Sequence, residues 1–334
     1  MTSDDDPRWM AAALALAERG RGRTAPNPNV GCVLVKDDRV VGRGWTQPGG
    51  RPHAEAMALA QAGEAARGAT AFVTLEPCVH ESPRGPACAD LLIAAGVARV
   101  VAAMRDPDPR TDGAGLARLA AAGVAVASEV LEPDARRMVA GWLTRRTLGR
   151  PFVTLKLGMS LDGCIALWDG RSQWITGPEA RAHAHLERSR HELICVGHRT
   201  LEKDAPRLDV RLAGLESRSP TRLVLTEYPG EAPEGWRDIN APGDILTDQL
   251  PGDHLLIEGG ASAASAFLGA DLVDRVLIYR APVIIGGGLT LSRIGLTALT
   301  DAHGRWHLHD SRRLGVDRLE VYERSPCSPE SSAT

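Results

Sequence analysis

Four side chains in the first third of the sequence have types and spacing that suit metal-dependent hydrolysis. His53 and Glu55 lie two residues apart at the start of an alanine-rich helical pattern, "RPHAEAMALA". On a regular helix, residues two apart point about 200° away from each other, so this pair can address one point only at a helix start. Pro52 favours such a start. Taken alone, the pair also suits an ordinary surface histidine and glutamate.

Two cysteines supply the other ligands of a zinc site. Cys78 follows a short apolar strand and a proline, and Cys88 lies where the next helix begins, which favours its thiolate form. One imidazole and two thiolates neutralise Zn²⁺ and leave the fourth tetrahedral position for water, whereas a purely structural site uses a fourth protein ligand. Glu55 is the candidate proton carrier between that water and a departing amine. We therefore expect His53, Cys78 and Cys88 to bind zinc and Glu55 to be catalytic.

The spacing of the cysteines departs from a known pattern. His-x-Glu followed by Pro-Cys-x-x-Cys is typical of zinc deaminases. His-Ala-Glu and Pro77-Cys78 fit it, but ten positions instead of three separate Cys78 from Cys88. Two unrelated buried cysteines are the alternative explanation. We interpret the intervening "VHESPRGPA" as a loop that contacts the substrate.

Alternating helices and strands must position these residues. Asp6 and Pro7 predict an N-cap and the first turn of a helix that ends at Gly20. The stretch "NVGCVLVKDDRVVGRGW" predicts two strands joined at Asp37-Asp38. Further strands in "ATAFVTL" and "ARVVAAM" alternate with helical patterns, and one helix is expected over "PDARRMVAGWLTRR". This alternation predicts an α/β layer sandwich.

A second α/β block follows the helix breakers Gly149 and Pro151. Its strands are expected in "PFVTLKLGMSLDG", "LICVG", "TRLVLT", "HLLIE" and "RLEVYER", with a helix in "GPEARAHAHLERSRHE". The 334 residues exceed what one hydrophobic core usually supports. We predict domains at 1–147 and 150–324, and a disordered tail, "SPCSPESSAT", at 325–334.

Composition excludes several classes of protein. A net charge of -3 and 4% aromatic residues give no basic surface for long nucleic acid. The acidic start "MTSDDDPRWM" is unlike a secretory signal, and no apolar run approaches the roughly 18 residues of a membrane span. We expect a cytoplasmic protein with no membrane or nucleic-acid partner. Its six scattered cysteines are expected to be reduced thiols or metal ligands, with no role assigned to Cys32, Cys164 or Cys195.

Three stretches carry a resemblance to a known family: "TAPNPNVGCVLVKDDRVVGRGW", "PHAEAMALAQAGEAARGATAFVTLEPC" and "ACADLLIAAGVARVVAAMRDPDP". They closely resemble the deaminase half of the bifunctional riboflavin-biosynthesis deaminase/reductase family. This implies a cytidine-deaminase-like three-layer α/β/α domain in which Asn27 and His80 contact a pyrimidine substrate. An amide can donate to and accept from the edge of a heterocycle, although "PNPN" also suits a plain turn. Members usually have one residue fewer between the two cysteines.

The second block resembles the reductase half of the same family, through "LKLGMSLDGCIA", "GRSQWITGPEAR", "EKDAPRLDVR", "LIEGGASAASAFL" and "LVDRVLIYRAPVIIGG". The resemblance implies a dihydrofolate-reductase-like α/β domain that uses NADPH. The residues that it places along the cofactor are Gly158, Trp174, Thr200, Asp204, Gly260, Ala261, Ser262, Ala263, Ala264, Ser265 and Ala266. Those that it places against the substrate are Lys156, Ser172, Arg188, Leu208, Arg211 and Glu258.

Elementary chemistry supports part of this assignment. The strand, glycine turn and helix start around Gly260 can receive a phosphate on backbone N–H groups, although the turn is not Gly-x-Gly-x-x-Gly. Arg188 and Arg211 can bind a phosphate through two donors each. Two departures stand against it: Ala205 replaces a usual acid, and Asp209 replaces a usual threonine. Because an acid near a phosphate weakens its binding, we expect Asp209 to point elsewhere.

The resemblance covers nearly all of residues 7 to 323. It implies zinc-dependent hydrolytic deamination of 2,5-diamino-6-ribosylamino-4(3H)-pyrimidinone 5′-phosphate, then NADPH-dependent reduction of the ribosyl group to ribityl. We also expect a homo-oligomer, either a dimer or a tetramer. Three alternatives stay open: a deaminase fused to an inactive reductase domain, a nucleic-acid editing deaminase, and a non-catalytic protein stabilised by zinc.

Overall fold

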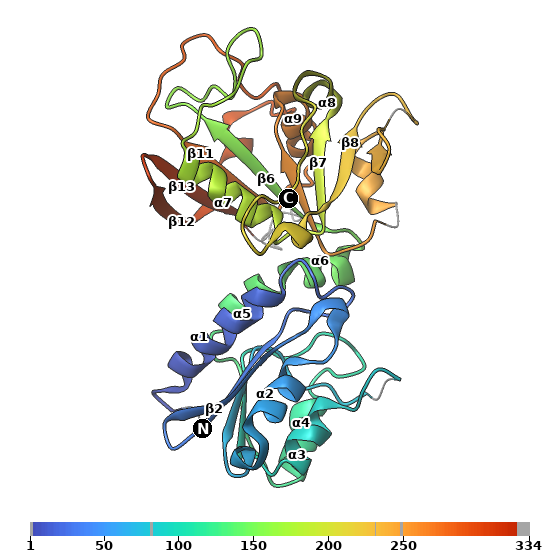
Figure 1. The fold of residues 1–334 in the computed structure, drawn as a ribbon, viewed down its shortest axis with the longest axis vertical. Helices are drawn as coiled ribbons and strands as arrows, with labels where there is room; N and C mark the ends of the chain where they lie inside the picture. The colour runs from blue at the N-terminus through green and yellow to red at the C-terminus, as the bar shows by residue number, and fades with distance from the viewer. Residues whose placement is uncertain (1–2, 81–82, 231, 248–249, 326–334) are drawn as a thin grey trace. The chain divides into compact units, whose positions relative to one another are not determined.

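The structure, a computed structural model, describes residues 3–80, 83–230, 232–247 and 250–325 (Figure 1). The chain divides into two compact units between Thr147 and Leu148. Each unit has its own mixed sheet and its own hydrophobic core. Of the tail expected to be disordered, all but Ser325 lies outside the described residues, and Cys327 lies there too.

The first sheet begins with the predicted hairpin. Strand β1 spans Gly31–Lys36 and pairs antiparallel with β2, Arg39–Trp45. Asp37 and Asp38 join them with φ angles of 49° and 55°. Positive φ at both central residues is what a two-residue type I′ turn requires, and aspartate tolerates it better than most residues. The two strands and their turn are therefore confirmed.

The remaining strands place two loops at one edge of the sheet. Strands β3 (Thr70–Val73), β4 (Arg99–Ala102) and β5 (Ala125–Ala127) complete the order β2-β1-β3-β4-β5. β3 and β4 run parallel to each other. Chains that leave two parallel neighbours therefore emerge at the same edge, which is the usual place for a ligand in such sheets. Cys78 follows β3 and Asp106 follows β4.

Helices cover both faces of this sheet. Gly31 faces α1 (Asp6–Ala17), where an added Cβ would lie 1.9 Å from the Ala13 carbonyl oxygen. Gly44 faces α2 (Ala54–Ala62), where an added Cβ would lie 2.0 Å from the Ala54 carbonyl oxygen. Gly44 pairs with Cys32, the neighbour of Gly31, so the two helices lie on opposite faces. The other helices of this unit are α3 (Cys88–Ala94), α4 (Ala114–Ala121), α5 (Glu132–Met138) and α6 (Ala140–Leu148).

Two predicted helix boundaries are wrong. Asp6 is the first residue of α1 and Asp5 is the N-cap, because the Asp6 carboxylate is used elsewhere. It accepts the Ser3 backbone N–H at 2.9 Å and pairs with Arg99 at 2.6 Å. The single helix expected over "PDARRMVAGWLTRR" is two helices, α5 and α6, because Val139 has non-helical backbone angles of -100° and 18°.

The second unit contains eight strands in the order β12-β13-β11-β6-β10-β7-β8-β9. Neighbours from β11 to β9 are parallel, and β12 and β13 add an antiparallel edge. The strands are β6 (Phe152–Met159), β7 (Leu193–Gly197), β8 (Thr221–Leu225), β9 (Trp236–Ile239), β10 (His254–Glu258), β11 (Arg275–Arg280), β12 (Trp306–Leu314) and β13 (Asp317–Arg324). β12 was not predicted, because this edge strand is largely exposed and lacks an apolar alternation.

Three helices pack on the second sheet. They are α7 (Pro178–Arg188), α8 (His198–Asp204) and α9 (Ala261–Gly269). Ala180 of α7 packs in one cluster with Leu277 and Tyr279 of β11, whereas Phe267 of α9 packs in another with Val276. Adjacent strand residues point to opposite faces, so α7 and α9 cover opposite sides. Among the described residues, no helix combines the length and apolar character needed to cross a membrane.

Candidate functional site

The structure brings the three expected zinc ligands together in the N-terminal unit. His53 precedes α2 as its N-cap, Cys78 follows β3, and Cys88 is the first residue of α3. Their ligand atoms all lie within 4.8 Å of one another. His53 Nδ1 is 3.3 Å from Cys88 Sγ and 3.7 Å from Cys78 Sγ. Among the described residues, no other group of three His, Cys, Asp or Glu side chains forms such a cluster.

The loop between the cysteines closes on itself despite its unusual length. The Cys88 backbone N–H donates to Cys78 Sγ at 3.4 Å, and the Ala89 N–H donates to the Cys78 carbonyl at 3.1 Å. The start of α3 therefore lies directly beside Cys78. Two cysteines ten positions apart can thus address one ion. Glu81 and Ser82 of this loop lie outside the described residues.

The donor set fits zinc. One imidazole nitrogen and two sulfurs match a hydrolytic zinc site, in which the fourth position is left for water. Hydrogen bonding with Cys88 and with His53 lowers the pKa of the Cys78 thiol to about 3, despite the opposing effect of burial. The shared hydrogen bond and burial raise the pKa of the Cys88 thiol, so without metal the pair favours one thiolate, whereas bound zinc requires both thiols to be deprotonated.

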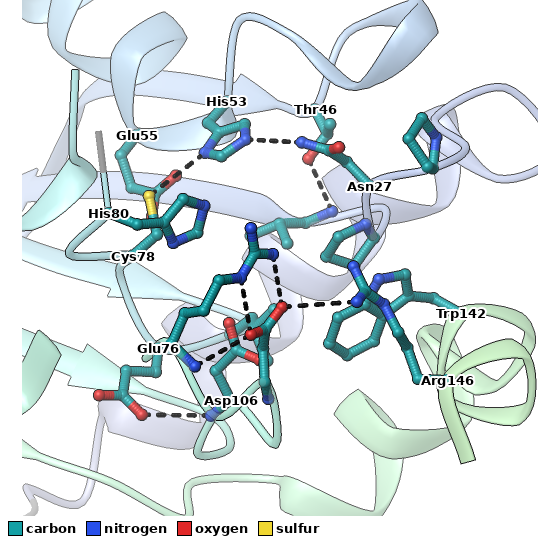
Figure 2. Close-up of a pocket in the computed structure, with 16 residues that line it drawn as sticks. Asn27, Thr46, His53, Glu55, Glu76, Cys78, His80, Asp106, Trp142 and Arg146 are labelled. Atoms are coloured by element: carbon teal, nitrogen blue, oxygen red, sulfur yellow. Dashed lines mark hydrogen bonds and ion pairs between the residues drawn. The ribbon is translucent and has the colours of Figure 1, made fainter. Parts of the chain in front are cut away.

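Glu55 lies in the first turn of α2, buried beside His53 and Cys78 (Figure 2). Glu55 is only 4% exposed. This burial raises the pKa of its carboxyl, and the electrostatic interaction with His53 partly offsets that rise. A carboxyl that is not held permanently ionised can both accept and donate a proton. The position and environment of Glu55 suit the proton carrier that the sequence suggests.

The two expected substrate-contacting residues of this unit line the same pocket. The Asn27 amide nitrogen donates to the Gly50 carbonyl at 3.0 Å and lies 2.9 Å from His53 Nε2. Asn27 therefore also contacts the ring of an expected zinc ligand. His80 Nδ1 is buried and has no hydrogen-bond partner in the described part of the chain. An unpaired buried nitrogen facing a pocket is available to a ligand.

Most of the residues that line the pocket were not predicted from the sequence. The pocket encloses about 550 Å³, counting the space at its open mouth. The lining residues that were not singled out include Asp106, Asp108, Arg110, Trp142 and Arg146. A usable signal was present for the first three. They follow β4 in "RDPDPR", and a chain that leaves β4 must emerge at the same edge as the Cys78 segment.

Glu76 forms hydrogen bonds that hold the loop after β4 next to the segment that carries Cys78. Its buried carboxylate accepts the backbone N–H groups of Asp106 at 3.2 Å, Gly113 at 2.9 Å and Gly115 at 2.8 Å. Gly115 must stay small, because an added Cβ would lie 2.0 Å from the Pro77 carbonyl oxygen. Glu76 lies two residues before Cys78, so the wall that carries Asp106 is fixed relative to the ligand cluster.

In the C-terminal unit, three of the expected substrate residues form one charged cluster. Lys156 and Glu258 are register partners on the parallel strands β6 and β10. Arg188, the last residue of α7, donates two hydrogen bonds of 2.8 Å to the Glu258 carboxylate. Lys156 Nζ lies 3.6 Å from the same carboxylate. Burial raises the pKa of Glu258, but the two cations outweigh it and bring the pKa to about 2.

The Asp209 carboxylate is paired with two neighbouring arginines, and its direction relative to a bound phosphate stays a prediction. Its carboxylate pairs with Arg211 at 3.1 Å and with Arg207 at 2.6 Å. Its backbone carbonyl also accepts a hydrogen bond from Arg188 at 2.9 Å. With two exposed arginines next to it, the aspartate gains more from pairing than from turning into solvent. Arg211 is thus already paired with a carboxylate.

The expected cofactor residues occupy two places around α8 and α9. Gly259 and Gly260 have φ angles of 86° and 72° and join β10 to α9, whose first residues are Ala261 to Ala266. Thr200 of α8 lies against this turn, since a Cβ on Gly260 would lie 2.8 Å from Thr200 Oγ1. The strand, turn and helix predicted at this position are confirmed.

The other expected residues of this half are spread over neighbouring segments. Asp204 is the exposed last residue of α8, and Gly158 lies near the end of β6. The Ser172 carbonyl accepts the Ile175 N–H, and the Trp174 ring between them is 66% exposed, with the Arg181 guanidinium 4.8 Å from its centre. Leu208 is buried in a small cluster with Ile194 and Leu256.

Two families of known domains match the chain. Residues 3–104 match the cytidine and deoxycytidylate deaminase zinc-binding region, and residues 151–234 and 244–318 match the RibD C-terminal domain. The riboflavin biosynthesis protein RibD of Escherichia coli (strain K12) is 41% identical and is aligned over 93% of this chain and 97% of its own length. RibD of Aquifex aeolicus is 36% identical and is aligned over 90% of this chain and 94% of its own length.

Solved structures agree with these matches. A deaminase/reductase from Thermotoga maritima superposes with a TM-score of 0.86 at 32% identity, covering 96% of this chain and 98% of the other. RibD of Acinetobacter baumannii superposes with a TM-score of 0.84 at 34% identity, covering 96% of this chain and 99% of the other. The fold and the site thus define a two-part enzyme, a zinc-binding deaminase joined to a reductase.

The chain belongs to the RibD family of bifunctional riboflavin-biosynthesis enzymes. The predicted α/β fold class is confirmed, with a cytidine-deaminase zinc-binding region in the first unit and a RibD C-terminal domain in the second. The predicted zinc site is confirmed in the deaminase half, whose matched region is a zinc-binding one, and NADPH stays a prediction for the reductase half.

Proposed function

We propose that the N-terminal unit hydrolyses the ring amine of 2,5-diamino-6-ribosylamino-4(3H)-pyrimidinone 5′-phosphate and releases ammonia. The C-terminal unit then reduces ribose C1′ of the product with hydride from NADPH, which opens the sugar to a ribityl chain. The observation that carries this proposal is the meeting of His53, Cys78 and Cys88 within 4.8 Å, with buried Glu55 beside them in a pocket. The name of the Thermotoga maritima relative supports the same pair of activities.

Each deaminase residue has a distinct role in this proposal. His53, Cys78 and Cys88 hold zinc, which when bound supplies a water that is activated near neutral pH. Glu55 would accept the proton of the attacking water and deliver it to the exocyclic amino group, so that this group leaves the ring carbon as ammonia. Asn27 and His80 orient the pyrimidine, and their position on the pocket wall supports this.

The reductase residues hold the two reactants against each other. Lys156, Ser172, Arg188, Leu208, Arg211 and Glu258 contact the substrate. Gly158, Trp174, Thr200, Asp204 and the segment 260–266 bind NADPH, with a phosphate on the N-terminal N–H groups of α9. The chemistry needs no covalent intermediate with the protein, since positioning the nicotinamide against C1′ is enough.

One assay tests both halves. The purified, zinc-loaded enzyme receives the phosphorylated pyrimidinone with and without NADPH, and ammonia and the 340 nm absorbance of NADPH are followed separately. We expect ammonia in both reactions and loss of absorbance in the second. Ammonia without NADPH oxidation would instead support a deaminase fused to an inactive reductase. The pairing of Asp209 with Arg211 is the feature that favours this second candidate.

The proposal includes a homo-oligomer, either a dimer or a tetramer. Strand β12 is the edge strand of the second sheet and exposes Leu308 by 54%. Ile284 and Leu299, which precede this strand, are each 77% exposed. An open strand edge next to exposed apolar side chains favours association with another chain. Light scattering coupled to gel filtration tests this, and a mass of one chain at micromolar concentration would contradict it.

A cytoplasmic location is also proposed. The five described cysteines, Cys32, Cys78, Cys88, Cys164 and Cys195, are all free thiols, as is usual in a reducing compartment. The use of NADPH supports the same location. Fractionation of cells that express the full chain tests it.

A further inference from the structure

The zinc-site pocket has a second polar end, separate from the ligand cluster. Figure 2 shows Trp142 and Arg146, both from α6, well apart from His53, Glu55 and Cys78. Asp106, Asp108 and Arg110 from the loop after β4 line the pocket as well. None of these residues takes part in the deamination chemistry described above.

Two arginines at this end share one buried carboxylate. Arg110 donates to Asp108 from Nε at 2.9 Å and from Nη2 at 2.6 Å, and Arg146 Nη1 lies 3.7 Å from the same group. The Asp108 side chain is 5% exposed, whereas those of Arg110 and Arg146 are 56% and 48% exposed. The two arginines therefore face two carboxylates, Asp108 and Asp106, at this end of the pocket. Arg146 forms no hydrogen bond with any residue that the structure describes, so its five N–H donors remain available.

Trp142 adds an unpaired donor at the same place. The residue is 4% exposed, lines the pocket, and its indole Nε1 is buried without a hydrogen-bond partner in the described residues. An indole N–H can only donate, so its natural partner is an acceptor oxygen. Arg146 lies one helical turn further along α6, with its guanidinium 5.6 Å from the Trp142 ring. The two donors are therefore neighbours on one helix face.

Substrate geometry points to the occupant of this end. In the deamination proposed above, on which this inference rests, the ring amine must lie at the zinc ligands. The phosphate is attached to the other end of the ribose, so it must lie away from them. Arginines are well suited to a phosphate, since each can offer two parallel donors to its oxygens.

We propose that Arg110, Arg146 and the Trp142 indole N–H bind the 5′-phosphate of the deaminase substrate. Arg146 is the principal contact, because its donors are not used by the protein. Asp108 fixes Arg110 and keeps it aimed at the pocket. The Asp106 carboxylate lies on the same wall and, as an acceptor, faces N–H donors of the substrate and not its phosphate. The N-terminal unit thus selects a phosphorylated nucleotide with residues distant from the reacting carbon.

A comparison of two substrates tests the phosphate contact directly. Ammonia release is measured with the phosphorylated pyrimidinone and with the same compound bearing a free 5′-hydroxyl. For Arg146→Met we expect KM for the phosphorylated compound to rise on the order of 10-fold to 100-fold, the range of a lost charged hydrogen bond. Turnover at saturation should change little, and the free-hydroxyl compound should react as it does with the unmodified enzyme. Trp142→Phe keeps the ring, removes the N–H and should show the same selectivity with a smaller effect.

Arg136→Met is the matched control. Arg136 lies on α5, its side chain is 56% exposed and it pairs with Glu132, but it does not line the pocket. This variant should leave KM for both compounds unchanged. Equal losses with both compounds in Arg146→Met, or no loss with either, would overturn the phosphate assignment.

A binding measurement separates this inference from the proposed function. Calorimetry with the full-length, zinc-loaded Glu55→Gln enzyme gives the affinity for both compounds without turnover. We expect Arg146→Met, added to this background, to weaken binding of the phosphorylated compound alone, on the order of 10-fold or more. Failure of the unmodified enzyme to release ammonia would count against the proposed reaction only. Equal affinities of the two Glu55→Gln proteins for the phosphorylated compound would count against the phosphate site only.

Discussion

Two buried carboxylates, one in each half, have opposite pKa shifts. Asp106 in the deaminase pocket is 6% exposed, and burial raises its pKa to about 6. The Glu258 side chain in the reductase half is 12% exposed, but Lys156 and Arg188 outweigh the effect of burial and bring its pKa to about 2. The difference lies in the partners, since Asp106 accepts the Asp108 backbone N–H and has no cation of its own.

This difference indicates how each half completes its site. In the reductase half the fold itself supplies the counter-charges of Glu258, because Lys156 and Arg188 are already paired with its carboxylate. The deaminase pocket leaves two buried nitrogens without a hydrogen-bond partner among the described residues, His80 Nδ1 and Trp142 Nε1. Such groups reduce stability unless a ligand pairs with them. We therefore expect the first half to gain more from its metal and substrate than the second half gains from its own ligands.

The largest expected effect separates the two halves at Glu55. Glu55→Gln removes the proton carrier but keeps the size and burial of the side chain. Ammonia release should fall by about 10²-fold to 10⁴-fold, the usual contribution of a general acid and base. Reduction of the deaminated substrate with NADPH should be unchanged, and zinc content should remain at one per chain. A variant that keeps full ammonia release would show that another group carries the proton.

The next prediction tests the ligand ten positions from Cys78. Cys88→Ser should lower the zinc content, measured by atomic emission, well below one per chain, because serine is a much poorer zinc ligand than a thiolate. Ammonia release should be lost with the zinc, and NADPH oxidation with the deaminated substrate should be kept. Cys195→Ser is the control, since Cys195 is buried in β7 of the other unit. Undiminished zinc in Cys88→Ser would mean that Cys88 is not a ligand.

Local signals allowed much of the fold and the zinc cluster to be predicted from sequence. The Asp37-Asp38 turn fixes its hairpin through backbone conformation alone. His53 and Cys88 were placed at helix starts by Pro52 and by the apolar pattern after Cys88, and both lie there. In each case the deciding interactions involve residues within one or two turns.

The rest of the pocket depends on contacts between distant segments. Arg146 and Trp142 are on α6, far along the chain from His53, and nothing in their spacing marks them as pocket residues. The pairing of Asp209 with Arg207 and Arg211 was likewise not predicted, because sequence does not show which of several nearby cations an acid will pair with. Such choices are made by packing, which a single sequence does not reveal.

The next prediction removes the negative charge from the cluster of Lys156, Arg188 and Glu258 in the reductase half. Glu258→Gln leaves Arg188 and Lys156 without their buried counter-charge, so the C-terminal unit should lose about 3–5 kcal/mol of unfolding free energy at pH 7. Hydrogen exchange in urea reports this unit separately from the other. The stabilisation from ionised Glu258 is complete above the unfolded pKa of 4.5 and is lost as pH falls through the folded pKa of about 2. The difference in unfolding free energy between the unmodified enzyme and Glu258→Gln should therefore become smaller in acid.

Glu320→Gln is the control for that experiment. Glu320 pairs with Arg280 at 3.0 Å in the same sheet, but the Arg280 side chain is 29% exposed compared with 11% for Arg188. Its loss should therefore cost only about 1 kcal/mol. Equal losses for the two variants would mean that the Glu258 cluster is no more buried in solution than an ordinary surface pair.

The smallest effect has the opposite sign and concerns Asp106. Asp106→Asn keeps an oxygen for the Asp108 N–H and removes a buried charge that no cation balances, so the N-terminal unit should gain about 1–3 kcal/mol at pH 7. Because the folded pKa of about 6 lies above the unfolded value of 3.8, the gain should be absent below pH 3.8 and complete above about pH 6. Asp108→Asn should instead destabilise the unit, since hydrogen bonds from Arg110 hold the pKa of Asp108 below its ordinary value. Urea unfolding at pH 4 and pH 7.5 measures both variants, and a gain for Asp106→Asn that does not change with pH would show that its charge is not the cause.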